Sequence, residues 1–191
     1  MTGRTHDAIA FASLITIATF YPPARLNLAT ASACIVANIV GGTLPDIDQA
    51  SNRLWDLLPF GDNIGSVVRR IFMGHRTITH SLIGVFIFTS LFLFAIPKIF
   101  NSDYINGDLI FWALEIGYIS HLFGDALTKD GLPLFFPFPI KIGIPPFRFM
   151  RITAGSWVEN LIVLPGTAFY IFWFIGRYQS HVNELLKMII S

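Results

Sequence analysis

The sequence predicts an all-α membrane protein, a polytopic helical bundle of about five spans with two long loops on one face. Of its 191 residues, 53% are hydrophobic and only 13% are charged, whereas soluble domains carry about 25% charged residues. Apolar runs of helical length alternate with polar or proline-containing segments. No internal repeat is visible, so we expect one membrane-embedded domain over residues 1–191.

The first two spans are predicted at residues 8–21 and 26–44. A cleaved signal peptide is the alternative for the first run, which follows a polar head with Arg4 and His6. Its end is rich in aromatics and prolines and has no small-residue cleavage site, which favours a retained helix. The second run is rich in Ala, Ser, Thr and Gly, residues that allow helices to approach closely in lipid. Pro45 ends it.

The third span is predicted at about residues 79–96, ending at Pro97. We expect Thr77 or Thr79 to cap this helix, which would begin near His80. The connection before it, residues 49–73, contains an amphipathic portion with three arginines and is expected to lie on the membrane surface.

The fourth and fifth spans are predicted at residues 109–127 and from after Glu159 to about 175. Glu115, inside the fourth, is either a protonated, hydrogen-bonded core group or a second functional acid. The connection 128–157 is rich in Pro, Gly and Phe, and its segment 134–138 is too short to span, which indicates an interfacial or re-entrant loop. The single cysteine, Cys34, cannot form an internal disulfide.

Polar residues gather where the predicted spans end. Asp46 and Asp48 stand at the mouth of an apolar helix, where two carboxylates are costly unless a cation lies between them. His121 and Asp125 are four residues apart, so on a helix they project from one face and can hold an ion or pair with each other. The stretch 74–81 holds two imidazoles and a guanidinium. The alternative for each motif is a polar flank whose side chains are simply solvated at the end of a helix.

Five alternating spans would place these groups on one face of the membrane. That face would also carry nine of the 13 lysines and arginines, so the positive-inside rule predicts that it is cytoplasmic. The polar groups predicted to meet there are His6, Asp46, Asp48, His75, Arg76, His80, His121, Asp125 and Glu159.

Histidines and carboxylates without a thiolate suit a divalent ion, zinc first, with manganese or iron as alternatives. The number of candidate ligands allows one to three ions, and multi-ion sites commonly clamp a phosphoryl group. Arg76 is suited to grip a phosphate with two parallel hydrogen bonds. Ser81, Thr128 and Glu159 stand in or beside these motifs and are the further catalytic candidates.

The motifs at residues 45–48, 74–81 and 117–133 together resemble those of the YdjM-like, LexA-regulated family of membrane-bound metal-dependent hydrolases. That family is distantly similar to zinc-dependent phospholipase C and to single-strand nucleases with the same helical core. The resemblance implies metal ligands at His6, at Asp46 or Asp48, at His75 or His80, and at the His121–Asp125 pair. It departs at Glu159, because the histidine expected four residues earlier is absent.

These observations predict a metal-dependent hydrolase that cleaves a phosphoester of a membrane lipid at the cytoplasmic leaflet of the inner membrane. The alternative is a non-enzymatic membrane protein, either a cation-binding transporter or a regulatory partner. Transporter sites usually lie near mid-bilayer, whereas this cluster stands at span ends. We expect no nucleic-acid partner, although the net charge of +1 by itself argues neither for nor against one. The sequence does not determine the oligomeric state.

Overall fold

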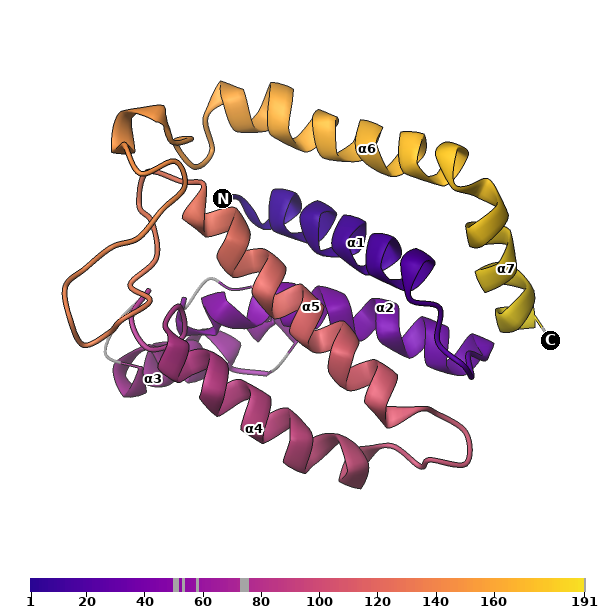
Figure 1. Cartoon of the computed structure of the whole chain (residues 1–191). Coiled ribbons are helices and arrows are strands. Elements are labelled where there is room, and N and C mark those ends of the chain that lie inside the picture. The colour runs from indigo at the N-terminus through magenta and orange to yellow at the C-terminus, as the bar shows by residue number, and fades with distance from the viewer. Residues whose placement is uncertain (50–51, 53, 58, 73–75, 191) are drawn as a thin grey trace.

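The computed structural model describes residues 1–49, 52, 54–57, 59–72 and 76–190, and all regular elements in these ranges are helical (Figure 1). The all-α prediction is therefore confirmed. The long helices are α1 (Gly3–Phe20), α2 (Leu28–Thr43), α3 (Gly61–Ile71), α4 (Leu82–Ile99), α5 (Gly107–Ala126), α6 (Leu164–Arg177) and α7 (Gln179–Ile190). Short turns are η1 (Leu44–Asp48), η2 (Trp55–Leu57), η3 (Arg148–Met150) and the π-helical η4 (Glu159–Val163).

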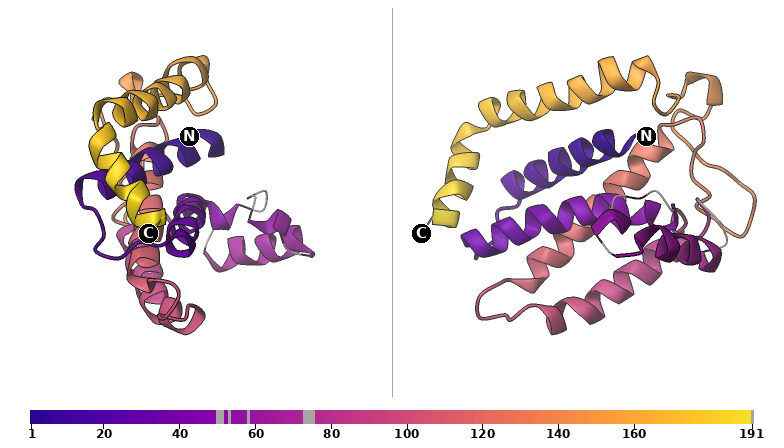
Figure 2. Two further views of the ribbon diagram at one scale, coloured as in Figure 1. Left: turned by 90° about the vertical axis from the view of Figure 1, so that its right-hand side faces the viewer. Right: turned by 180° about the vertical axis from the view of Figure 1, so that it is seen from behind.

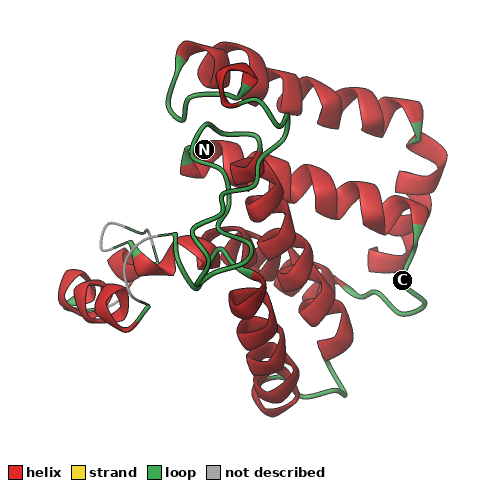
Figure 3. Cartoon of the chain, turned by 60° about the vertical axis from the view of Figure 1, so that its left-hand side comes forward, coloured by secondary structure: helices red, strands yellow, loops and turns green. Residues whose placement is uncertain are grey.

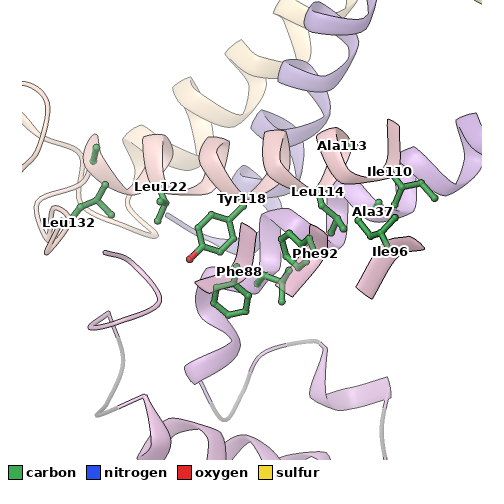
Figure 4. Packing of buried hydrophobic residues seen from close by; sticks show 12 residues of the cluster. Ala37, Phe88, Phe92, Ile96, Ile110, Ala113, Leu114, Tyr118, Leu122 and Leu132 are labelled. Carbon is green, nitrogen blue, oxygen red and sulfur yellow. The ribbon is translucent and has the colours of Figure 1, made fainter. Parts of the chain in front are cut away.

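Helix α5 is the centre of the bundle and packs against α1, α2 and α4. Helix α6 lies along α1, and α7 turns back across the far end of the bundle (Figures 1 and 2). The hydrophobic core lies where α2, α4 and α5 meet, with Phe88 and Phe92 of α4 packed against Tyr118 and Leu114 of α5 (Figure 4). The Tyr118 hydroxyl also donates a hydrogen bond to the backbone carbonyl of Thr79. This bond ties α5 to the segment that precedes α4.

Two glycines let α2 and α5 cross at backbone contact. A Cβ atom on Gly117 would lie 2.1 Å from the Asn38 carbonyl oxygen, and one on Gly41 would lie 2.2 Å from that of Leu114. Buried Asn38 donates from Nδ2 to the Ala113 carbonyl at 3.1 Å, which adds a polar link across the same crossing. The small residues predicted to allow close approach therefore do so here, and the crossing fixes how the ends of α2 and α5 face each other.

Three segments are long and apolar enough to cross a membrane: Leu28–Asp48, Leu82–Ile99 and Glu159–Arg177. The prediction of about five spans is not confirmed, because α1 and α5 are not among these segments. Acidic residues lower the hydropathy of α5, and one of them, Glu115, accepts a hydrogen bond from the Thr89 hydroxyl of α4 at 2.8 Å. This contact supports the expectation of a hydrogen-bonded core group for Glu115.

The structure corrects three predicted boundaries. The N-cap of α4 is Ser81, whose hydroxyl accepts from the Gly84 N–H at 3.3 Å, and not Thr77 or Thr79. Helix α4 also continues through Pro97 to Ile99, because a proline this close to the C-terminus interrupts few backbone hydrogen bonds. Residues 179–190 form α7 where only a tail was expected.

The connection 128–157 contains no long helix and folds back on itself. Isolated β-bridges pair Thr128 with Ile152 and Leu132 with Ile142. The Arg151 guanidinium donates to the backbone carbonyls of Pro145 and Pro146, at 2.7 Å each. The N–H groups of Ile144 and Ile152 donate to the carbonyls of Ala126 and Leu127, at 2.8 and 3.0 Å, and hold the connection against the end of α5.

Candidate metal centre

Helix ends meet at one end of the bundle and bring the polar motifs together. The chain places the start of α1, the end of α2, the start of α4 and the end of α5 at this end (Figure 1). We call it the site end. His6 comes from the first turns of α1 and Asp46 from η1, while His80 immediately precedes the cap of α4. The last two turns of α5 supply His121 and Asp125.

The five side chains form two overlapping groups whose ligand atoms lie within 4.8 Å of one another: His6 with His121 and Asp125, and Asp46 with His80 and His121. His6 Nε2 lies 3.3 Å from Asp125 Oδ1. His80 Nε2 lies 3.4 Å from Asp125 Oδ2 and 3.5 Å from Asp46 Oδ1. Ligand atoms around a tetrahedral zinc ion with bonds of about 2.0–2.1 Å are about 3.3 Å apart. These spacings therefore fit a shared ion better than direct hydrogen bonds, which are usually about 2.7–3.2 Å long.

The histidines of the cluster are buried and crowded. His6, His80 and His121 are each at most 1% exposed. The rings of His6 and His121 stack with centroids 3.7 Å apart and planes 10° from parallel. The stacking brings together two imidazoles, the side chains that most commonly bind metals.

A backbone carbonyl fixes the tautomer of His121. Its Nδ1 lies 2.7 Å from the Gly42 carbonyl oxygen, which can only accept, so Nδ1 carries the proton. The lone pair is then on Nε2, which is buried and makes no hydrogen bond. Both ring nitrogens of His6 are also buried without a hydrogen-bond partner. Buried polar atoms are costly when unsatisfied, and a cation would satisfy them.

The Thr79 hydroxyl fixes the tautomer of His80 in a similar way. The Thr79 hydroxyl donates to Asp48 Oδ2 at 2.9 Å and lies 2.9 Å from His80 Nδ1. Since its one proton points at the carboxylate, the hydroxyl accepts the proton of His80 Nδ1. His80 Nε2 is thereby left as the ligand atom. Asp48, predicted as a metal ligand, lies behind the histidine and orients it, an arrangement common around metal sites.

Arg76 lies across the mouth of the cluster and is only partly exposed. Its backbone has φ 57°, uncommon for a residue with a side chain, and its N–H donates to Asp48 Oδ2 at 3.1 Å. The guanidinium makes an ion pair with Asp125 Oδ2 at 2.7 Å and donates to Asp130 Oδ2 at 2.9 Å. Asp130 was not predicted as a site residue. The sequence offers no signal for it beyond its place in the polar connection after α5.

The geometry limits how ions could be shared. An imidazole nitrogen has one lone pair, so His121 Nε2 can serve only one ion at a time. The two oxygens of Asp125 face different histidines, Oδ1 toward His6 and Oδ2 toward His80. Oδ1 also accepts a hydrogen bond from the buried N-terminal ammonium of Met1 at 2.6 Å, so an ion bound there would share this oxygen or displace the ammonium. The cluster therefore suits either one ion with several of these ligands or two ions bridged by Asp125.

The remaining predicted site residues make structural contacts beside the cluster. Ser81 caps α4. The Thr128 hydroxyl donates to the backbone carbonyl of Asp125 at 2.8 Å. Buried Glu159 accepts from the N–H and hydroxyl of Thr2 and from the N–H of Gly155, at 2.6–2.8 Å. These contacts hold the start of α1 and the end of α5 in place around the cluster. His75 lies outside the residues that the structure describes.

The fold and the site define an all-helical membrane protein with a buried histidine–carboxylate cluster at one end of its bundle. The chain belongs to the YdjM inner membrane protein family, whose family model matches residues 1–184. This match confirms the resemblance seen in the sequence. A membrane location follows from the family and from the apolar helices.

Two relatives show how far the similarity extends. The uncharacterized protein YvsG of Bacillus subtilis (strain 168) is 32% identical over 182 residues, which cover 95% of this chain and 99% of YvsG. The inner membrane protein YdjM of Escherichia coli (strain K12) is 34% identical over 104 residues, or 53% of this chain and 48% of YdjM. No solved structure is significantly similar to the chain.

Proposed function

We propose that this protein is a metal-dependent hydrolase that cleaves a phosphoester of a membrane lipid. The observation that carries the proposal is the convergence of three buried histidines and two aspartates at the site end, where both ring nitrogens of His6 and Nε2 of His121 make no hydrogen bond. The metal would be held by His6, Asp46, His80, His121 and Asp125. Zinc is the first choice because all donors are imidazole nitrogens or carboxylate oxygens, and manganese and iron are the alternatives.

When bound, such an ion supplies Lewis-acid activation of water and of a phosphoryl oxygen. The protein's own residues prepare that chemistry. The Gly42 carbonyl and the Thr79–Asp48 pair point the lone pairs of His121 and His80 into the cluster. Because these supporting groups are fixed before any ligand arrives, little reorganisation is needed during the reaction.

Arg76 is the proposed phosphate-binding residue. Its guanidinium reaches the cluster at Asp125 and the surface at Asp130, and its side chain is 16% exposed. Asp46, 21% exposed, opens the cluster to the same surface. A phosphate entering there could replace the carboxylates as the partner of the planar guanidinium fork. Asp130 would hold the fork in place before the substrate binds.

The surroundings of the cluster support a lipid as substrate. The Leu82 N–H at the start of α4 donates to the Leu134 carbonyl at 3.0 Å, so the segment 134–138 lies beside the site. Phe135 and Phe138 of this segment are 49% and 65% exposed. Aromatic side chains of this kind favour the membrane interface and can contact acyl chains there.

We further propose that the site end faces the cytoplasm. The chain order places residues 44–81 and 127–163, with the start of α1, at this end. The nine lysines and arginines in these segments exceed the four in the rest of the chain, namely Arg25, Lys98, Arg177 and Lys187. In a Cys34→Ser background, a cysteine in place of the exposed Lys141 should be protected from a membrane-impermeant thiol reagent in intact cells, and labelling from outside would overturn the orientation.

Activity on lipid phosphates tests the proposed reaction. Purified protein supplied with zinc should release product from at least one member of a panel of phospholipids and lipid phosphates, with a nucleotide as the soluble comparison. Arg76→Lys should lower kcat/KM by about 10- to 100-fold, mainly through KM, because lysine keeps the charge but loses paired, charge-assisted hydrogen bonds. Its metal content should stay at the wild-type level. Retained metal with no cleavage of any panel member would favour a transporter or regulatory protein instead.

A further inference from the structure

Helix α3 also lies at the site end, and the metal cluster does not explain its position or its exposed side chains. It stands outside the bundle, to one side, and packs against the short turns η1 and η2 rather than against the long helices (Figures 2 and 3). In the view along the bundle, α3 extends sideways away from it (Figure 2, left). A helix in this position, at the end of the segments that can span the bilayer, is placed to lie along a membrane surface.

The side chains of α3 divide into separate faces. At about 100° per residue, Ile64, Val67 and Ile71 fall within about 60° of one another. They are 39%, 54% and 66% exposed. The face that packs against the protein is a different one, about 90° away, and contains the buried Gly61 and Gly65. The stripe formed by Ile64, Val67 and Ile71 is therefore not the side by which α3 is attached.

Gly61 shows how closely the other face is attached. A Cβ atom there would lie 1.9 Å from the Trp55 carbonyl oxygen, so α3 is held against η2 at backbone contact. The apolar stripe remains exposed although the helix is firmly seated. Repacking α3 onto the bundle would break this contact. The stripe thus needs a partner from outside the described chain.

The charge beside the stripe indicates what that partner is. Arg69 and Arg70 lie in the last turn of α3 and are exposed, but only Arg70 flanks the stripe, about 60° from Val67, because Arg69 lies on the opposite side of the helix. An amphipathic helix with an apolar stripe and a flanking arginine is suited to the interface of a bilayer that contains anionic lipid. A protein partner would need to bring both an apolar groove and acidic groups, whereas the bilayer is already present around the spans.

We propose that α3 is an interfacial helix that inserts Ile64, Val67 and Ile71 into the bilayer surface and holds anionic phospholipid headgroups with Arg70. The inference does not require the proposed hydrolase activity. Since α3 packs against η1, the turn that carries Asp46 and Asp48, docking would also connect the lipid surface to the wall of the metal cluster. The site would then be supported on the leaflet from which a lipid substrate enters.

Spin-label accessibility tests this placement in the full chain. In a Cys34→Ser background, single cysteines at Ile64 and Val67 sample the stripe, while a cysteine at Ser66, at least 100° from both, samples the polar side as the matched control. Each labelled protein is placed in nanodiscs of phosphatidylcholine with or without phosphatidylglycerol. Oxygen concentrates in the lipid, and a water-soluble nickel complex is excluded from it. All three positions are exposed, so the substitutions leave the packed face intact.

With phosphatidylglycerol present, labels at Ile64 and Val67 should favour oxygen and the label at Ser66 should favour nickel. Arg70→Gln should weaken the docking equilibrium by about fivefold, the contribution of one arginine near an anionic surface, whereas Arg69→Gln should change it less. Nickel access at the stripe would show that it faces water and would overturn the proposal. Protection from both reagents would show a protein partner, such as a second copy, and would overturn it equally. Docking that does not depend on phosphatidylglycerol would overturn the role of Arg70.

Discussion

The two ends of the bundle use polar residues in opposite ways. At the far end, Asn27 and Asn106 cap α2 and α5, and their side-chain oxygens accept backbone N–H groups at 2.7–3.3 Å. Thr30 there accepts from the Asn106 N–H at 3.1 Å. At the site end, His6 and His121 are buried with ring nitrogens that have no hydrogen-bond partner. Polar groups that only end a helix are satisfied by its backbone, so the unsatisfied ones indicate a ligand.

The crossing of α2 and α5 supports both ends, so breaking it gives the largest expected effect. Gly117→Ala would put a methyl group against the Asn38 carbonyl and should destabilise the protein by about 3 kcal/mol. Gly166→Ala in α6 is the matched control, because a Cβ atom there meets nothing within 4 Å. Thermal unfolding in detergent should show a clear loss for the first variant and none for the second. Equal midpoints would contradict the close crossing.

The Asp48–Thr79 pair behind His80 should affect metal affinity more than folding stability. Asp48→Asn removes the charge that orients Thr79 and His80, and Thr79→Val removes the hydroxyl between them. Losing such outer partners typically costs 10- to 100-fold in metal affinity. Competition with a zinc-selective chelator measures this change, with the exposed Asp103→Asn as the control. Unchanged zinc affinity in both Asp48→Asn and Thr79→Val would show that Asp48 does not support the metal site.

A substitution at the far end should lower the stability of the protein without changing its metal content. Asn106→Ala removes the cap of α5 and should lower the stability by about 1 kcal/mol. Metal content should stay the same, since this residue stands at the other end of the helix that carries His121. A loss of metal beyond the loss of folded protein would mean that the two ends are coupled, and the comparison between them would fail.

The smallest expected effect concerns Asp130, which is 55% exposed in its pair with Arg76. Exposed ion pairs contribute at most about 1 kcal/mol. Asp130→Asn should therefore raise KM for a phosphate-containing substrate by no more than about fivefold and leave kcat and metal content unchanged. An effect as large as that of Arg76→Lys would assign Asp130 a direct role in the site.

The sequence predicted which residues would meet but not what each would contact. Apolar runs and span alternation place His6, Asp46 and His121 at one end, and a spacing of four puts His121 and Asp125 on one helical face. Periodicity cannot show hydrogen bonds between distant residues. Asp48 was therefore predicted as a ligand although it contacts Thr79, 31 residues away.

Other features of the site could not be predicted for the same reason. Ser81, Thr128 and Glu159 were catalytic candidates because they stand beside the motifs, but the sequence could not show that Ser81 caps α4 or that the other two bond to backbone groups. The left-handed backbone of Arg76 carries no sequence signal, because such conformations usually occur at glycine or asparagine. The count of five spans stays a prediction, because the acidic residues of α5 lower its hydropathy although the partly buried Glu115 accepts a hydrogen bond from Thr89.

Elemental analysis of the purified protein tests the central claim most directly. Wild type should contain at least one zinc, manganese or iron ion per chain. His121→Ala and Asp125→Ala should lose most of this metal, because each removes a side chain that lies close to several other candidate ligands of the cluster. His181→Ala and Asp103→Ala, which change exposed residues of the same types away from the cluster, should keep the wild-type content. Metal-free wild type, or equal metal in all four variants, would contradict the assignment of this cluster as a metal centre.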